Sequence, residues 1–163
     1  MRDPMAKTAG LITIFLVAAL ALPASAATRA VLLMPFGFLD TSGEPRDQGA
    51  DHDRRLAAAR DSLGSQLGAA GPYRLVTSDA AAACPAGDSD CILAAARAAG
   101  ADLVLTGTVQ KVSTMLIQAW IGVFDAADGH RLFFRQINFR GDNDESWRRA
   151  AEFLSDELLA SPP

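Results

Sequence analysis

An α/β domain built on one mixed sheet is the fold class that this sequence predicts, on two observations. Strand-like apolar runs alternate with helical stretches from residue 30 to residue 112, which is the pattern of strand–helix–strand units with parallel strands. Two further strand-like runs then flank Asp128-Gly129, a dipeptide that favours a tight hairpin turn. We therefore expect the order β-α-β-α-β-β-β-α, with three parallel strands, an antiparallel end and a mixed five-stranded sheet covered by helices.

The first expected strand is the continuous apolar run AVLLMPF at 30–36, which is typical of a strand buried on both faces. The polar segment 38–51, rich in Gly, Pro and Asp, is expected to be a loop. Residues 53–70 repeat Leu and Ala at helical spacing, with arginines on the opposite side. Asp51 or Asp53 is expected to cap this helix, and a Gly-Pro pair stops it.

A short strand, YRLVT at 73–77, is expected next. The Ala-rich stretch 91–100 predicts a second helix, capped by Ser89 or Asp90 and ended by a glycine. The third strand is expected over 101–112, where a glycine in mid-strand indicates a bulge or a close neighbour.

The last two strands are expected at 113–126 and 130–140, on either side of the hairpin turn. A final helix begins after 142–144, whose side chains suit a helix N-cap. It carries Trp147 and Leu154 on one apolar stripe.

The N-terminus has the three-part layout of a secretory signal peptide over residues 1–26. Arg2 and Lys7 precede a run of about 13 apolar residues, and Ala24-Ser25-Ala26 supplies the small residues that a signal peptidase reads. An uncleaved anchor is the alternative, but such a run is too short for a bilayer that needs about 20 apolar residues. We expect cleavage after Ala26, a periplasmic location, and a single domain over 27–163 with no membrane span.

The charge of the chain excludes a general nucleic-acid-binding protein. The whole sequence carries a net charge of −4, and the predicted leader would remove two basic residues and one acidic residue, which leaves −5. Binding to nucleic acid needs a basic face that displaces counterions from phosphates. No nucleic-acid partner is therefore expected.

Cys84 and Cys91, in the stretch CPAGDSDC, are the only cysteines. In an exported protein such a pair is normally a disulfide, and Pro85 and Gly87 allow the chain to turn back. A redox pair is more often CxxC, and a zinc site would need two more ligands, so we favour a structural disulfide over these two alternatives.

Four stretches together resemble a known family: AVLLMPF, YRLV, CILAAARAAGADLVLTGTV and the hairpin DGHRLF. They are similar to the periplasmic α/β domain shared by the N-terminal part of TolB and the curli secretion component CsgG. Over about residues 30–160 the chain also looks like small secreted bacterial proteins known only as domains of unknown function. The resemblance implies assembly or contacts with envelope proteins, and it brings no catalytic residue. No lipobox cysteine stands at the predicted cleavage site, so lipid attachment is not expected.

The sequence offers few candidates for a site, and no catalytic residue and no cofactor are expected. Neither GxSxG nor a Gly-rich phosphate loop occurs. Asp51, His52 and Asp53 are weak candidates for a metal site, because capping is the commoner reason for acidic residues at a helix start. The candidate partner surface consists of two tryptophans and two neighbours on a strand: Trp147, Trp120, Leu116 and Gln118. For Trp147, at the start of an amphipathic helix, a position in the core is the commoner one.

These observations favour a non-catalytic periplasmic binding or adaptor protein, with an envelope or periplasmic protein as its partner. The alternative is an accessory protein of a periplasmic enzyme system, such as quinoprotein alcohol oxidation, and it rests on the resemblance alone. A stand-alone enzyme has least support, since only His52 and His130 are available as bases. Either histidine beside an acid in a deep cleft would argue against the adaptor hypothesis.

Overall fold

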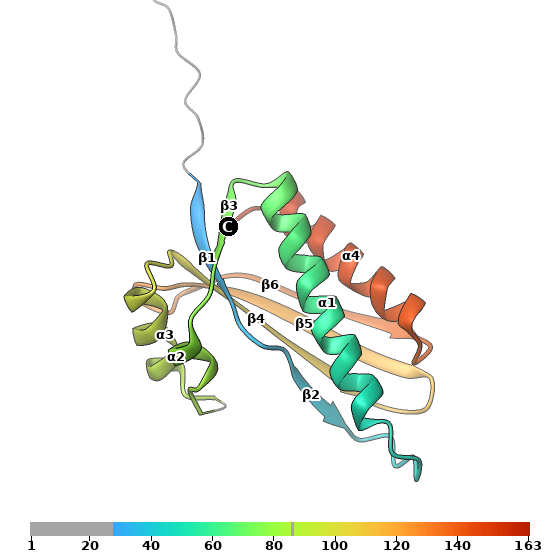
Figure 1. The fold of residues 1–163 in the computed structure, drawn as a ribbon. Helices are drawn as coiled ribbons and strands as arrows, with labels where there is room; N and C mark the ends of the chain where they lie inside the picture. The colour runs from blue at the N-terminus through green and yellow to red at the C-terminus, as the bar shows by residue number, and fades with distance from the viewer. Residues whose placement is uncertain (1–27, 86) are drawn as a thin grey trace, which may run out of the picture.

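The computed structural model describes residues 28–85 and 87–163, and the predicted signal peptide lies outside them. It confirms a single α/β domain with a mixed sheet and helices packed on it (Figure 1). The elements in chain order are β1 (Arg29–Leu33), β2 (Gly37–Asp40), α1 (Gly49–Ala70), β3 (Tyr73–Val76), α2 (Asp79–Ala82), α3 (Ser89–Ala98), β4 (Leu103–Lys111), β5 (Leu116–Asp125), β6 (Arg131–Arg140) and α4 (Asp144–Ala160).

The strand order is β3-β1-β4-β5-β6, and β2 also pairs with β4. Strand β1 is parallel to both β3 and β4, as the helical crossovers predict, while β4, β5 and β6 form an antiparallel meander. In the last turn of the meander Gly129 has a φ of 76°, a left-handed conformation that favours glycine. The hairpin expected at Asp128-Gly129 is therefore confirmed.

One expected strand is divided, which gives six strands instead of five. Strand β1 ends at Leu33, because Pro35 has no N–H to continue a ladder. The chain then pairs with β4 again as β2, beginning with Gly37 opposite Thr108. Between the two strands the Phe36 ring lies over Gly107, where a Cβ atom would come within 2.7 Å of it. The glycine in mid-strand thus marks a close neighbour, and the expected loop in fact begins with a strand.

The helix starts also differ from the prediction. Helix α1 begins four residues early, after Gln48, so neither Asp51 nor Asp53 caps it. Helix α3 is capped by Asp88, whose carboxylate accepts a hydrogen bond from the Cys91 N–H at 2.9 Å. The short helix α2 was not predicted. Helix α4 does start as expected, with Asn143 as its N-cap.

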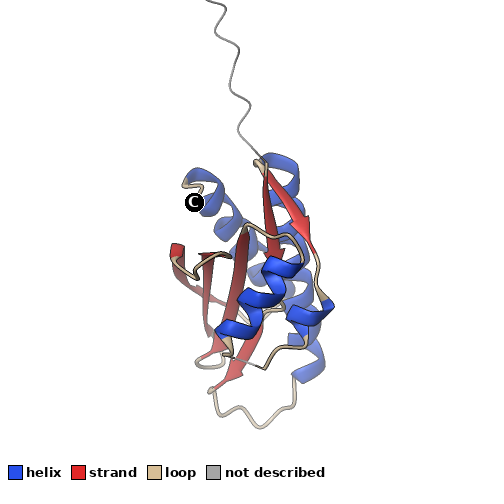
Figure 2. Cartoon of the chain, turned by 90° about the vertical axis from the view of Figure 1, so that its left-hand side faces the viewer, coloured by secondary structure: helices blue, strands red, loops and turns tan. Residues whose placement is uncertain are grey.

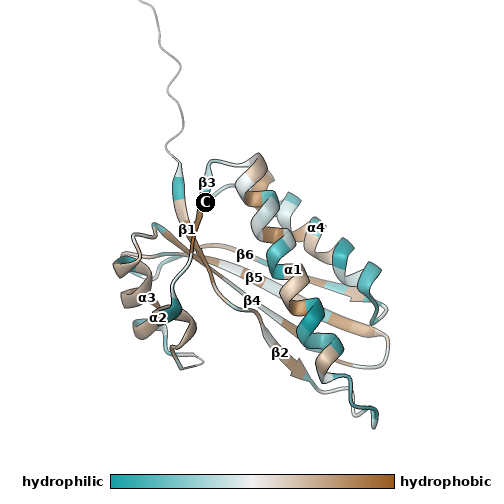
Figure 3. Ribbon diagram, viewed as in Figure 1, coloured by the Kyte–Doolittle hydropathy of each residue, from teal (hydrophilic) through white to brown (hydrophobic). Residues whose placement is uncertain are grey.

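The core has two layers of unequal size. Helices α1 and α4 pack against each other and cover one face of the sheet (Figure 1), and the α2–α3 pair lies on the other face, as the view turned by 90° shows (Figure 2). Polar and apolar residues alternate along α1 and α4, with the strands between the layers mostly apolar (Figure 3). The larger cluster includes Leu63, Leu67, Leu105, Ile121 and Leu158, and the smaller one includes Leu32, Ala96, Val104 and Ala126.

Cys84 and Cys91 form the expected disulfide, with their Cα atoms 5.8 Å apart. The bridge closes the loop between α2 and α3, so it holds together the smaller helical layer.

Replacing both cysteines by serine should lower the free energy of unfolding by about 2.5 kcal/mol, because the unfolded chain regains the entropy of an open loop. Urea unfolding of the oxidised protein and of the Cys84→Ser/Cys91→Ser variant measures this difference. Adding a reductant to the native protein serves as the control, since it should reproduce the loss and should leave the serine variant unchanged.

Candidate functional site

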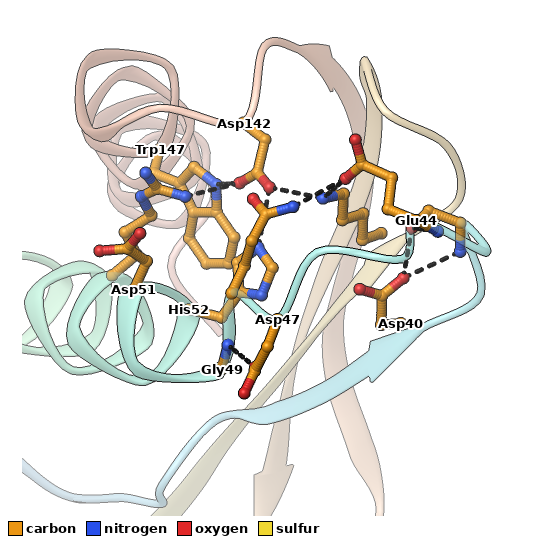
Figure 4. A network of polar contacts seen from close by, with 12 residues as sticks. Asp40, Glu44, Asp47, Gly49, Asp51, His52, Asp142 and Trp147 are labelled. Carbon is orange, nitrogen blue, oxygen red and sulfur yellow. Dashed lines mark hydrogen bonds and ion pairs between the residues drawn. The ribbon is translucent and has the colours of Figure 1, made fainter.

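A buried group of charged side chains lies where the loop after β2, the start of α1, the end of β4 and the start of α4 meet (Figure 4). We call it the Asp142 cluster, and its members are Glu44, Gln48, His52, Arg55, Lys111, Asp142 and Trp147. The Lys111 and His52 residues are 0% and 2% exposed. Charges at this depth persist only when they are paired and hydrogen-bonded.

The Asp142 carboxylate is the centre of the cluster because each of its oxygens contacts two nitrogen atoms. Oδ2 lies 2.8 Å from His52 Nε2 and 3.0 Å from Lys111 Nζ. Oδ1 accepts hydrogen bonds from Arg55 at 2.8 Å and from the Trp147 indole at 3.1 Å. Figure 4 shows these contacts converging on Asp142, with His52 and Trp147 on adjacent helices. One carboxylate therefore joins α1, β4 and α4.

The charges of the cluster stabilise one another. Burial would raise the pKa of the Asp142 carboxyl, but hydrogen bonds from His52, Lys111 and Trp147 outweigh it and lower that pKa to about 2. Burial would likewise lower the pKa of Lys111, yet its hydrogen bonds to Glu44 and Asp142 raise it. The cluster thus holds an ammonium between two carboxylates, and Gln48 donates a further hydrogen bond to Glu44 at 2.8 Å.

Aromatic rings enclose the histidine. The Phe38 ring lies 4.4 Å from the His52 ring, between ring centroids, and Trp147 follows at 6.1 Å. Because Phe38 belongs to β2, the strand that sequence reasoning missed also forms one wall of this site.

The Asp142 cluster is a buried network of charges. His52 lies beside an acid, as a general base would, but both side chains are buried, at 3% and 6% exposure. Their contacts are used within the cluster, where Lys111 and Arg55 also bind the carboxylate. Of the two features that would argue against the adaptor hypothesis, a histidine beside an acid and a deep cleft, this cluster shows the first.

The side chains of the weak metal candidates Asp51 and His52 point in different directions. Asp51 is exposed and pairs with Arg54 at 3.2 Å, whereas the neighbouring His52 points into the core toward Asp142. Within residues 28–85 and 87–163, no three His, Cys, Asp or Glu side chains are grouped so that they could hold a metal ion.

Sequence reasoning missed Lys111, although a signal was present. Alternation along β4 places it on the same side as Leu105 and Val109, which face α1 and α4. A lysine on the buried side of a strand predicts a buried partner of opposite charge. The partner itself, Asp142, was expected only as a possible helix cap.

The candidate partner residues divide between the core and the surface. Trp147 is 3% exposed and belongs to the core, so it does not contribute to a surface. Trp120 is half-buried and lies on the face of the sheet opposite α1 and α4, with Gln118 and Leu116 on the same side of β5. On the neighbouring strand β6, Gln136 lies opposite Trp120, Asn138 opposite Gln118, and Arg140 opposite Leu116.

We call this surface the open sheet face; its members are Leu116, Gln118, Trp120, Phe124, Arg131, Phe134, Gln136, Asn138 and Arg140. Phe134 is 48% exposed, and the Arg131 guanidinium lies 5.3 Å from the centre of its ring. Gln118 donates a hydrogen bond to Asn138 at 3.1 Å. The members include two arginines and no carboxylate, although the chain as a whole is acidic.

Residues 29–159 match the family DUF3280, which is described as "Protein of unknown function (DUF2380)". The chain belongs to this family. A search of curated proteins finds no match to the sequence.

Solved structures share the fold of this DUF3280 protein at low sequence identity. A putative neuraminyllactose-binding hemagglutinin homolog from Helicobacter pylori has a TM-score of 0.54 and 13% identity, over 84% of this chain and 89% of that one. TolB from Acinetobacter baumannii has a TM-score of 0.51 and 16% identity, over 84% of this chain and 28% of TolB. A PelC dodecamer from Paraburkholderia phytofirmans has a TM-score of 0.50 and 15% identity, over 83% and 86%. The resemblance to TolB is thus supported at the level of the fold, and the resemblance to CsgG is not.

Removing the central carboxylate should destabilise the protein strongly. The Asp142→Asn substitution leaves Lys111 and Arg55 buried without their shared partner, so the free energy of unfolding should fall by about 3–5 kcal/mol. Asp144→Asn is the matched control, because Asp144 also binds arginines but is 64% exposed, so solvent screens its ion pairs and the loss should be several-fold smaller. Urea unfolding measures both; equal losses would show that the buried cluster has no special weight.

The cluster should also make stability depend on pH in acid. The pKa of Asp142 is about 2 in the folded protein, below its ordinary 3.8, so its contribution is complete above about pH 4 and is lost as the pH falls toward 2. The loss from this group is about 2 kcal/mol. Unfolding curves of the native protein across this range should show the decline, and the Asp142→Asn variant should give a flatter curve.

Proposed function

We propose that this protein is a non-catalytic binding or adaptor protein of the bacterial envelope, and that the open sheet face is its partner-binding surface. The observation that carries the proposal is an aromatic and cationic sheet face that no described element covers at Trp120 and Phe134. Half-exposed aromatic side chains on a rigid surface are the usual anchors of protein–protein interfaces.

The rest of the domain suits a passive scaffold. The opposite face of the sheet is filled by α1 and α4, and the Asp142 cluster locks those helices to β4. The histidine that could act as a base in this cluster is 2% exposed. A surface that is held rigid by packing on its other side loses little conformational entropy when it binds a partner, which favours recognition.

The envelope location rests on the predicted signal peptide and on the fold shared with TolB. Among the described residues, no helix is both long and apolar enough to cross a bilayer. We propose that the mature protein acts in the periplasm, with another envelope protein as its partner.

Site-specific photo-crosslinking in living cells of the source organism tests this function. A photoreactive amino acid placed at Gln136, on the open sheet face, should give one discrete crosslinked species that contains an envelope protein. The same amino acid at Asp156, an exposed position on α4, is the matched control and should give none. Substituting Trp120→Ser in the Gln136 reporter should reduce the crosslink at least about tenfold, in line with the loss of an interface anchor.

Crosslinks of equal yield from Gln136 and Asp156, or none from Gln136 in any growth condition, would refute the open sheet face as the binding surface. Circular dichroism of each purified variant ensures that the comparison is made between folded proteins.

A further inference from the structure

Strand β6 is a long free edge of the sheet. It has ten residues and pairs with β5 alone in the described part of the chain, whereas the other edge strands, β2 and β3, have four residues each. In an antiparallel ladder about half of the backbone N–H and C=O groups of an edge strand point away from its neighbour. Seven of the ten residues are exposed, so this edge is accessible to another strand.

The charge along β6 has one sign. The strand contains Arg131, Arg135 and Arg140 and no acidic residue. Arg135 is neutralised from the helical side by Glu157, at 2.5 Å. Arg131 and Arg140 form no ion pair within residues 28–85 and 87–163, and they stand at opposite ends of the strand on the open sheet face. At about 3.3 Å per residue, about 30 Å separates them.

These charges favour an acidic occupant over a second copy of this chain. Arg131 and Arg140 have no acidic partner within the described residues, so a segment that brings carboxylates to these positions would neutralise them. A second β6 strand would instead bring three more arginines and no carboxylate to the same edge.

We infer that β6 receives an extended acidic segment of the partner protein as an added strand, with carboxylates near both ends of the segment facing Arg131 and Arg140. Apolar side chains between those ends lie against Phe134, which is half-exposed in the middle of the open sheet face. Backbone hydrogen bonds supply the affinity in this mode of recognition, and side chains supply the selectivity. The inference rests on the proposed function, since it specifies how the same surface holds its partner.

A synthetic peptide tests strand addition directly. It has the length of β6, alternates Val and Thr, and carries Glu residues at both ends; its affinity for the purified protein is measured by fluorescence anisotropy. Two further probes carry methyl groups on alternate backbone nitrogens: one peptide is methylated at its odd-numbered residues and the other at its even-numbered residues. Binding should persist for one methylated peptide and be lost for the other, because only one set of N–H groups faces β6.

Charge variants test the acidic preference. Arg131→Glu/Arg140→Glu should weaken binding of the Glu peptide about tenfold or more, since two attractive pairs become repulsive. Arg74→Glu/Arg149→Glu is the matched control with the same change in net charge, because Arg74 lies on the opposite edge strand and Arg149 is exposed on α4; binding should change less than about twofold. A peptide with Lys at both ends should bind the native protein at least about tenfold more weakly.

Failure of this inference can be told from failure of the proposed function. If the Glu peptide does not bind at millimolar concentration, if both methylated peptides bind equally, or if the Lys peptide binds as well, strand addition by an acidic segment is wrong. A crosslink from Gln136 that survives the Arg131→Glu/Arg140→Glu substitution would then still support a partner on the open sheet face. A dimer seen by analytical ultracentrifugation, and lost in that variant, would instead identify a second copy and overturn the inference.

Discussion

The architecture depends on one buried carboxylate. Asp142 accepts or shares hydrogen bonds with four side chains, which come from the start of α1, the end of β4 and the first turn of α4. Without this carboxylate, Lys111 would keep only Glu44 as an acidic partner, and His52 would have no acidic partner among the described residues. Because removing one member leaves the others charged and buried, the group acts as a single unit and fixes where the two large helices sit on the sheet.

This fixed point has consequences for the other side of the sheet. Helices α1 and α4 cover one face of the sheet. The smaller α2–α3 layer covers the other face only over the start of β4, so it leaves part of β5 and β6 uncovered. Phe134 is therefore exposed on this face, and Trp120 is half-buried beside it. The uncovered surface thus arises because the α1–α4 layer spans the sheet on one face, whereas the α2–α3 layer covers only part of the other face.

Local sequence signals predicted most of the fold because they act over short distances. The Asp128-Gly129 turn follows from the stereochemistry of a few neighbouring residues, and the cysteine pair is close enough in the chain to be read as a disulfide once export is expected. The glycine of β4 indicated a close neighbour, but only the structure shows that this neighbour is Phe36. The division of the first strand was missed, although Pro35 marks it, since only pairing with β4 shows that the chain returns to the sheet. The N-caps of α1 and α3 were misplaced by one to five residues for a similar reason, because several polar residues near each helix start can serve as a cap.

The sequence by itself determined the fold class, the strand directions and the disulfide, because hydrophobic period, turn chemistry and export constrain them locally. Only the tertiary structure decided the roles of His52, Lys111 and Asp142, which are far apart in the chain and look like a histidine at a helix start, an isolated lysine and a helix cap. Their pairing depends on how β4 and α4 end beside the start of α1. Tertiary packing likewise decided that Trp147 belongs to the core and that Trp120 is half-buried on the open sheet face. Alternation along β5 shows that Trp120 faces away from Ile117 and Ile121, but only the placement of the helices decides which face they cover.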